Sequence, residues 1–323
     1  GYVLSLKENE PIDERFFAGK FRAAAAKRGA FADQAAYRLF NGTGDGLGGL
    51  VVDVYNGCYV FRWQNAALKQ QARLIYAGFE RIMGKDKVVV AATPGQEATQ
   101  LISGQLPDQP MNVLENSVTY PVDLTLSRQQ LALEFRETRD WARQTSQRKR
   151  VLNLFSAETG LVTAAMVGGA IEAVTVDPTN RATTTLQAQL AANNLEQAPV
   201  EMRTMDVTNY LDYAIKHGLT FDTIMINPPA FIRGKKRAFT LDQDLQALVE
   251  QAFQVAQSGA KILVTATAPM YSMKNLQSTV NAAVENYTGH VTAFNTYNSP
   301  DDFLTNVADR HSESLKGLLL SVD

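Results

Sequence analysis

The C-terminal part of the chain, residues 126–323, alternates short apolar runs with longer segments of helical period. Seven of the short runs have the length and the branched or aromatic content that predict β-strands. This alternation is typical of a mostly parallel sheet covered by helices on both faces, as in Rossmann-like α/β domains. The predicted strands cover residues 151–155, 173–176, 202–205, 223–226, 261–265, 291–296 and 317–322.

An apolar stripe between the fourth and fifth of these strands predicts a long helix. Its members recur at spacings of four and three residues, which places them on one helical face packed against the core. The pair Ser258-Gly259 is a common helix stop, so we expect the helix to end there. The stripe consists of Leu241, Leu245, Leu248, Ala252 and Val255.

The first 125 residues predict a smaller α/β domain. Good helix formers fill residues 16–27, and two strand-like runs, 51–55 and 59–63, are separated by Asn56-Gly57. Asn-Gly predicts a tight hairpin, because both residues tolerate a positive φ. A helical face then follows, residues 87–92 read as a strand, 93–110 as a loop and 113–126 as one or two strands. That helical face contains Leu68, Ile75, Phe79 and Ile82. We therefore predict two domains, 1–125 and 126–323.

A cluster of glycines occupies residues 42–49. A phosphate-binding P-loop would end in Gly-Lys-Ser or Gly-Lys-Thr and lead into a helix, whereas this segment leads into the strand at residues 51–55. We interpret these glycines as turn geometry.

Composition restricts the compartment and the chemistry. A net charge of −2 neither indicates nor excludes nucleic acid, so any such partner must bind local basic patches. The single cysteine, Cys58, cannot form an internal disulfide, which fits a reducing compartment such as the cytoplasm. The longest apolar stretch, residues 161–171, is far shorter than the roughly 20 residues of a membrane span, and we expect a soluble protein. The three histidines lie far apart and predict no metal site.

Polar residues follow four of the predicted strands. Ser156 and Gly160 come after the first, Asp177 after the second, Asp206 after the third and Asn227 after the fourth. In an open parallel sheet, ligands bind beyond the carboxyl ends of the strands, near the point where strand order reverses. We therefore expect a ligand site at this edge.

The two aspartates favour an adenosine ligand. Asp177 stands where a carboxylate can accept hydrogen bonds from both ribose hydroxyls, and Asp206 could accept from an adenine amino group. Either residue could instead cap the following helix. A dinucleotide would need a Gly-x-Gly-x-x-Gly turn, and only Gly160 is present in the first turn, which disfavours NAD. S-adenosylmethionine carries no phosphate and can dispense with that turn.

Asn227-Pro228-Pro229-Ala230-Phe231 is the most specific motif of this half. The prolines fix φ and hold Asn227 in an extended conformation at the strand end. The Asn227 amide oxygen and a nearby carbonyl could accept an N–H of a base, and Phe231 could stack on it. The alternative is a rigid turn with a buried phenylalanine. Four cations follow within one predicted loop and could contact phosphates, namely Arg233, Lys235, Lys236 and Arg237.

These residues resemble the bacterial class I methyltransferases that act on cytosine in large-subunit ribosomal RNA, nearly from end to end. The similarity is carried by residues 37–42, 45–50, 53, 133–139, 151–156, 174–177, 206–207, 227–229 and 315–317. It implies an upstream PUA-like barrel, whose last strand is expected at residues 2–6, an RNA-binding central domain and a methyltransferase domain. It also implies RNA as partner, S-adenosylmethionine as methyl donor and a possible homodimer.

The resemblance implies roles for particular residues. The lip residues Asn227, Pro228, Pro229 and Phe231 would contact the reacting base. The methyl donor would be bound by Arg136, Asn153, Phe155, Ser156, Gly160, Asp177, Pro178, Asp206, Val207 and Asn227.

Three departures separate the chain from that family. Methylation of the fifth carbon of cytosine requires a cysteine thiolate, and the family's Ser-Cys-Ser segment is replaced by residues 266–269, Ala-Thr-Ala-Pro. The family's Asp-Pro-Pro-Lys-Phe is Asn-Pro-Pro-Ala-Phe here, a form that resembles enzymes that methylate nitrogen. Two further segments, Lys-Thr-Gly and Thr-Gly-Gly, are replaced at residues 128–130 and 158–160.

The leading hypothesis is therefore an S-adenosylmethionine-dependent methyltransferase acting on a nucleobase of RNA, with nitrogen favoured over carbon. The first alternative is a catalytically silent RNA-binding relative that kept the fold and lost the chemistry. The second is an NAD oxidoreductase, which the missing glycine fingerprint disfavours.

Overall fold

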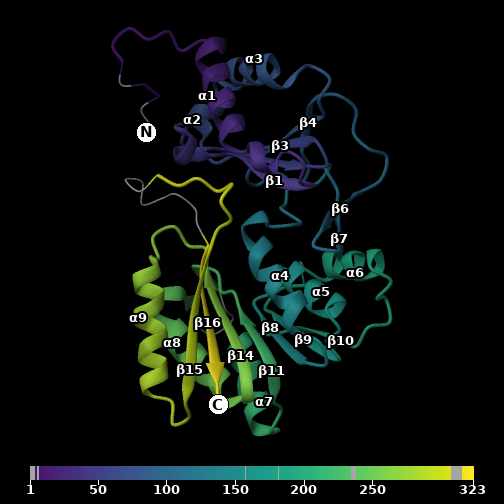
Figure 1. Cartoon of the computed structure of the whole chain (residues 1–323), viewed down its shortest axis with the longest axis vertical. Helices are drawn as coiled ribbons and strands as arrows, with labels where there is room; N and C mark the ends of the chain where they lie inside the picture. The colour runs from purple at the N-terminus through teal and green to yellow at the C-terminus, as the bar shows by residue number, and fades with distance from the viewer. Residues whose placement is uncertain (1–3, 6, 157, 181, 234–237, 307–314) are drawn as a thin grey trace. The chain divides into compact units, whose positions relative to one another are not determined.

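The computed structural model describes residues 4–323 except 6, 157, 181, 234–237 and 307–314 (Figure 1). Its contacts divide the chain into an N-terminal unit, Gly1–Leu133 with Pro300–Ser312, and a C-terminal unit, Glu134–Ser299 with Glu313–Asp323. The division therefore falls at residue 133 where we expected 126, and it assigns a late segment to the first unit. The strand expected at residues 2–6 lies largely outside the described residues.

The N-terminal unit contains a five-stranded sheet of order β1-β2-β3-β4-β5. The predicted hairpin is confirmed, since Asn56 (φ 46°) and Gly57 (φ 77°) join β2 to β3. Strand β5 lies inside the segment expected to be a loop, where it pairs with β4. The strands are β1 (Ala36–Asn41), β2 (Leu50–Tyr55), β3 (Cys58–Trp63), β4 (Val89–Ala92) and β5 (Gln100–Ser103).

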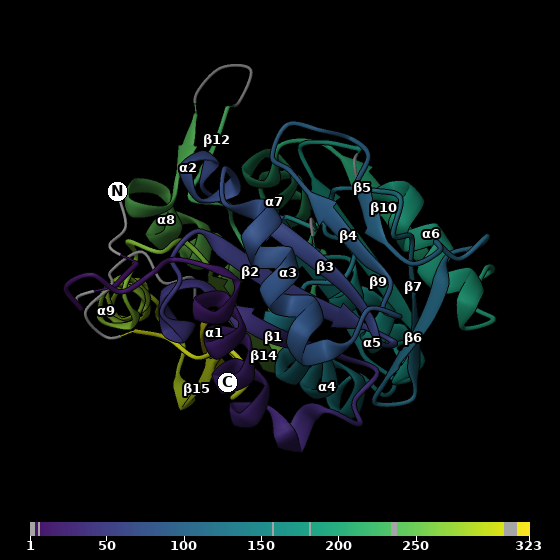
Figure 2. The same cartoon turned by 90° about the horizontal axis from the view of Figure 1, so that it is seen from above.

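Two helices, α1 (Glu14–Lys27) and α3 (Ala72–Met83), pack against each other over one face of this sheet (Figure 2). Phe21 of α1 and Phe79 of α3 meet Phe61 of β3 with ring centroids 5.1–6.0 Å apart. Leu68 is not on α3 as expected, because it belongs to a separate short helix, α2 (Ala66–Lys69). The remaining elements are the turns η1 (Gly29–Phe31) and η2 (Gly42–Asp45) and the hairpin β6 (Met111–Glu115) and β7 (Val118–Val122).

Asp53 lies on the opposite side of the sheet and is fully buried. Its carboxylate accepts from Arg38 at 2.9 Å and from Arg62 at 3.1 Å. The Arg38 guanidinium lies 4.1 Å from the centre of the Phe303 ring, which belongs to the late segment of this unit. A second buried pair, Arg28 and Asp45, is joined by two bonds of 2.6 and 2.7 Å.

The C-terminal unit contains a seven-stranded sheet of order β10-β9-β8-β11-β14-β16-β15. All pairs from β10 to β14 are parallel, and β16 is antiparallel to both of its neighbours. All seven predicted strands are present, and the Rossmann-like α/β fold is confirmed. The strands are β8 (Arg150–Leu154), β9 (Glu172–Asp177), β10 (Val200–Thr204), β11 (Phe221–Ile226), β14 (Ala256–Ala266), β15 (Val291–Asn298) and β16 (Lys316–Val322).

Alternate residues of these strands face different helices, as a pleated sheet requires. Leu152 and Leu154 of β8 share one apolar core with residues of three helices, α7 (Val207–Lys216), α8 (Leu241–Gln254) and α9 (Met273–Glu285). On the other side, α5 (Gly160–Val167) contacts β8 and β9 and packs on α4 (Arg136–Thr145) and α6 (Thr183–Ala192) (Figure 1). Smaller elements are η3 (Leu133–Phe135), β12 (Phe231–Ile232) and β13 (Phe239–Thr240).

The predicted stop of α8 at Ser258-Gly259 is wrong. The helix ends at Gln254, and both residues lie within β14. Gly259 has φ +79°, and the pairing of β14 with β11 shifts register between Ala256 and Lys261. The glycine thus serves an irregular strand start, a role that sequence alone does not distinguish from a helix end.

Among the described residues, none of the helices combines the length and the apolar content that crossing a bilayer would require.

Candidate site at the carboxyl edge of the seven-stranded sheet

Backbone hydrogen bonds beyond the strand ends hold the candidate site residues in one row. The N–H of Asn227 donates to the carbonyl of Leu154 at 3.1 Å, and that of Phe155 donates to Val176 at 2.9 Å. The N–H of Met205 donates to Asp177 at 3.0 Å. Strand order reverses between β8 and β11, so the four strand ends meet where parallel sheets bind ligands.

The turn after β8 is tightly built. Phe155 has φ +60°, a region that a bulky side chain rarely adopts, and its buried ring lies 5.0 Å from that of Phe239. Ser156 is buried, and Gly160 begins α5. Backbone strain of this kind is held by its surroundings and is common at ligand sites.

An ion pair braces this turn from α4. Arg139 donates to Glu158 at 3.2 Å, and both side chains are buried. Arg136, the residue that we expected near the methyl donor, lies half-buried in the first turn of the same helix. The motif around residues 133–139 therefore includes an arginine, Arg139, whose contact with the turn after β8 we did not predict.

Asp177 ends β9, and only one of its two carboxylate oxygens accepts hydrogen bonds from described residues. One oxygen, Oδ1, accepts from the Thr179 N–H at 2.8 Å and from the Thr179 hydroxyl at 2.7 Å. No described residue donates a hydrogen bond to Oδ2. Pro178, the next residue, is half-buried. A half-exposed carboxylate with one open oxygen fits the ribose hydroxyls of an adenosine ligand.

Asp206 fulfils the capping alternative. Its side chain accepts from the N–H groups of Thr208 and Asn209 at 3.0 and 3.1 Å, at the start of α7. The residue is exposed, and Val207 behind it is buried. A capping carboxylate retains further lone pairs, so the cap and an adenine contact are compatible.

The lip begins at Asn227, directly after β11. Its amide oxygen lies 3.0 Å from the Thr265 hydroxyl, which is buried in β14 and also lies 3.2 Å from the carbonyl of Ile226. Pro228 is buried and Pro229 half-buried, whereas Phe231 is 60% exposed. The rigid turn exists, but the phenylalanine that the structural alternative would bury faces solvent.

Asn153 and Thr175 face each other across β8 and β9 and are both almost fully buried. Neither the amide of Asn153 nor the hydroxyl of Thr175 has a hydrogen-bond partner among the described residues. Buried polar groups without partners are costly in a folded protein, so such groups call for a water or a ligand. Together with the open oxygen of Asp177, they fit a polar ligand such as S-adenosylmethionine.

Two further predicted features are the basic loop and the single cysteine. Of the basic loop, Arg233 is exposed, while Lys235, Lys236 and Arg237 lie outside the described residues. Cys58 lies in β3 of the N-terminal unit, with its sulfur 3.7 Å from that of Met111. Burial raises the pKa of the Cys58 thiol, which disfavours a thiolate nucleophile.

Sequence reasoning missed Thr265, Arg139 and Phe239. Each acts on a predicted site residue or turn through a contact between segments distant in the chain. Thr265 lies in the strand predicted at residues 261–265, and the only signal for its contact is that this strand is the next one in the chain after the strand that Asn227 follows.

The chain is similar to proteins of one family. Residues 68–306 match the sequence model of S-adenosylmethionine-dependent methyltransferases. The proposed ribosomal RNA large subunit methyltransferase YwbD of Bacillus subtilis is 30% identical over 99% of this chain and 84% of that protein. Ribosomal RNA large subunit methyltransferase I of Escherichia coli O157:H7 is 26% identical over 81% of this chain and 69% of its own length.

Solved structures agree. A proposed methyltransferase crystallised with S-adenosylhomocysteine (SAH) has a TM-score of 0.88 and 28% identity, covering 99% of this chain and 84% of the other. A proposed S-adenosylmethionine-dependent methyltransferase from Streptococcus mutans has a TM-score of 0.87 and 27% identity with the same coverage.

Proposed function

The chain belongs to the family of S-adenosylmethionine-dependent methyltransferases, and we propose that it methylates a nitrogen atom of a nucleobase in large-subunit ribosomal RNA. The choice of nitrogen rests on the lip, where the Asn227 amide oxygen lies beside the buried Thr265 hydroxyl. The chain has only one cysteine. The RNA substrate is proposed from the names of the relatives.

S-adenosylmethionine supplies an electrophilic methyl group when it is bound. The carboxylate of Asp177 would accept hydrogen bonds from its ribose hydroxyls, and the polar pair Asn153 and Thr175 would lie beneath the donor site. The strained turn at Phe155 and the pair Arg139–Glu158 would keep this surface in one conformation. The protein's contribution at this end is binding and orientation.

At the other end, the lip would orient the base. The Asn227 amide oxygen has a second lone pair besides the one facing Thr265, and the Pro228 carbonyl lies next to it in the chain. These two acceptors would bind the N–H groups of a base, and Phe231 would stack on its plane. With the base held there, its nitrogen would accept the methyl group as the methyl–sulfur bond of the donor breaks. S-adenosylhomocysteine would be the leaving group, and the surplus proton on the nitrogen would pass to solvent.

The alternative target, a ring carbon, needs a thiolate that adds to the base and makes the carbon nucleophilic. The chain has a single cysteine, and that residue is buried in the N-terminal unit with a raised pKa. Threonine and serine hydroxyls are far less acidic than a thiol and do not replace it. Nitrogen methylation needs only orientation and proton loss.

Mass spectrometry of nucleosides tests both parts of the proposal. Large-subunit RNA from cells that lack the gene would lose one methylated nucleoside, and expression of the chain would restore it. We expect that nucleoside to carry its methyl group on nitrogen, as its fragmentation and retention time would show.

The variant Cys58→Ser serves as the matched control and should restore the nucleoside as well as the unchanged chain does. A carbon-methylated product, or loss of rescue in Cys58→Ser with the fold intact, would contradict nitrogen as the target. Identical RNA with and without the gene would contradict methylation itself.

A further inference from the structure

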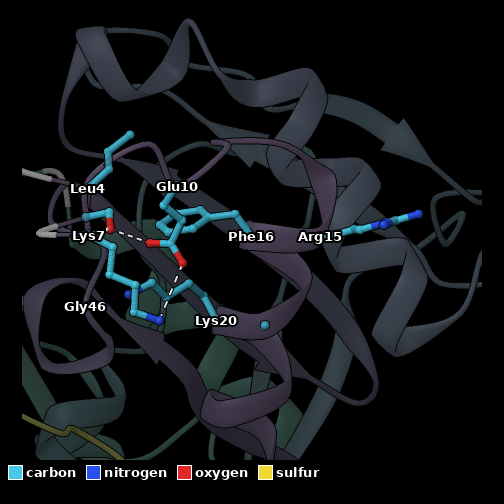
Figure 3. Close-up of a pocket in the computed structure, with 9 residues that line it drawn as sticks. Leu4, Lys7, Glu10, Arg15, Phe16, Lys20 and Gly46 are labelled. Atoms are coloured by element: carbon cyan, nitrogen blue, oxygen red, sulfur yellow. Dashed lines mark hydrogen bonds and ion pairs between the residues drawn. The ribbon is translucent and has the colours of Figure 1, made fainter.

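Two adjoining cavities line helix α1 of the N-terminal unit, with volumes of about 670 and 750 Å³. They share Gly19, Lys20 and Gly46, so they form one continuous groove, and Figure 3 draws the residues that line the first cavity. The first cavity is lined by residues from the start of the chain and α1, and the second by α1, the turn η2 and residues 305–306. We call this feature the α1 groove.

The exposed charge of the α1 groove is positive. Lys7 pairs with Glu10 at 3.8 Å, and these side chains point toward each other in Figure 3. Asp45 is buried, and Arg28 binds both of its oxygens at 2.6 and 2.7 Å. Each of these pairs is neutral as a whole.

Two lysines of the α1 groove lie outside these two neutral pairs and supply its positive charge. Lys20 has no acidic partner among the described residues, and it lies 5.3 Å from the centre of the Phe16 ring. Lys27 is half-exposed and reaches Asp45 only at 3.9 Å, outside the bonds of Arg28. Arg15, although it lines the first cavity, points away from the other labelled side chains.

The glycine cluster shapes this groove. Gly46 has φ +75°, and a Cβ at this position would come within 2.9 Å of the Lys20 Nζ. Gly44 lies so close to Leu304 that a Cβ would overlap its carbonyl. The glycines thus leave room for the Lys20 ammonium and bring the late segment of the unit against the turn.

Lys20 and Lys27 stand seven residues apart on α1, which spaces their backbones by about 10.5 Å along the helix axis. Two flexible ammonium groups in an open, elongated groove suit a repeating line of phosphates, since lysine binds phosphate as a point charge. A compact anion would instead need converging donors. The Phe16 ring, which packs against the core of this unit, lies under the Lys20 ammonium.

We propose that the α1 groove binds the phosphodiester backbone of single-stranded RNA, with Lys20 and Lys27 as its phosphate contacts. The proposal rests on the proposed function for the identity of the RNA, and it adds a binding surface separate from the lip at Asn227. It also assigns a use to the glycine cluster beyond turn geometry.

Fluorescence anisotropy with a labelled single-stranded RNA of mixed sequence, titrated over a range of salt concentrations, tests the proposal. The full chain would be compared with Lys20→Glu/Lys27→Glu and with a control, Lys85→Glu/Lys87→Glu, which makes the same charge change elsewhere in the unit. Circular dichroism and melting of each variant would establish that it is folded.

We expect the groove variant to bind RNA at least about tenfold more weakly, and its plot of log affinity against log salt to become shallower by about 1.4, or 0.7 for each lost contact. The control should retain the affinity and the slope of the unchanged chain. Equal affinity and slope in the two variants would overturn the proposal, since only net charge would then matter.

Calorimetry with S-adenosylmethionine separates this proposal from the proposed function. The groove variant should bind the methyl donor as the unchanged chain does. Absence of methyl transfer by the unchanged chain would contradict the proposed function and leave the RNA-binding measurement intact.

Discussion

The two large sheets of this protein differ in how fully the hydrogen bonds of their polar side chains are satisfied. In the N-terminal unit, the carboxylate of Asp53 is fully buried and both of its oxygens are bound, one by Arg38 and one by Arg62. Among the described residues of the C-terminal unit, none donates a hydrogen bond to Oδ2 of Asp177 at the sheet edge, and none pairs with the buried amide of Asn153. Polar groups whose hydrogen bonds are all satisfied stabilise the fold, whereas polar groups without such partners near a strand end are candidates for binding a ligand.

The largest expected effect comes from breaking a saturated pair. Arg28→Met would leave the Asp45 carboxylate buried without its bidentate partner, which should lower the free energy of unfolding by about 3–5 kcal/mol. Urea denaturation followed by circular dichroism measures this change. The double variant Arg28→Met/Asp45→Asn should recover much of the loss, and a single variant within about 1 kcal/mol of the unchanged chain would refute the assignment.

Substitution at the open edge should affect activity and not stability. Asn227→Ala would remove the amide that orients the base, and we expect kcat for methyl transfer to fall by about 100-fold, the lower end for a proton-handling group. Single-turnover assays with labelled S-adenosylmethionine give the rate. If the free energy of unfolding fell together with kcat, Asn227 would stabilise the fold and would not be a residue that orients the base.

Asp177→Asn tests the open carboxylate. An amide keeps the bond to Thr179 and weakens acceptance from ribose hydroxyls, so the affinity for S-adenosylmethionine should fall about tenfold, or 1.4 kcal/mol. Calorimetry measures the affinity. Asp206→Asn is the matched control, because asparagine also caps helices, and its donor affinity should change less. If the two variants lost the same affinity for S-adenosylmethionine, the Asp177 carboxylate would have no larger role in donor binding than the Asp206 carboxylate.

Thr265→Val probes a positioning residue. The valine keeps the shape of the side chain and removes the hydroxyl 3.0 Å from Asn227, so the amide would lose its orientation. We expect kcat to fall by a factor of about five with KM for RNA nearly unchanged, since one hydrogen bond is worth roughly 1 kcal/mol. A rise in KM without a change in kcat would indicate a role in binding only.

The smallest effect should be seen at Cys58. Burial raises the pKa of its thiol, so below pH about 8.5, where a free cysteine titrates, the folded protein should hold the thiol protonated and react slowly with iodoacetamide. The rate should rise only at higher pH, and urea should accelerate it at pH 8. Rapid labelling of the folded chain at pH 7 would contradict this description.

The strands of the C-terminal unit were predictable because burial on both faces leaves uninterrupted apolar runs, as in residues 223–226. The positions of residues that directly follow strands, such as Asp177 and Asn227, were also predictable, because the carboxyl ends of parallel strands lie at one edge of the sheet. Local pattern could not show the contact of Thr265 with Asn227, because it depends on which strands become neighbours. It also misread Gly259, whose positive φ serves a strand and not a helix end.

The unit boundary shows the same limit. Residues 300–306 are connected in sequence to β15, yet Asp302 accepts from the backbone of Arg38 at 2.7 Å and from the side chain of Arg28 at 2.8 Å. Nothing in the local sequence of this segment indicates a partner more than 260 residues upstream.

That late segment has a consequence for the order of events during synthesis. The N-terminal unit is interrupted after Leu133, and its next residue in the chain is Pro300. At roughly 5–20 residues per second, a ribosome needs about 8 to 33 s to add the residues between them. Throughout that interval the partners of Arg28 and Arg38 in the late segment do not yet exist, so this unit cannot complete its fold until the C-terminal unit is almost entirely made.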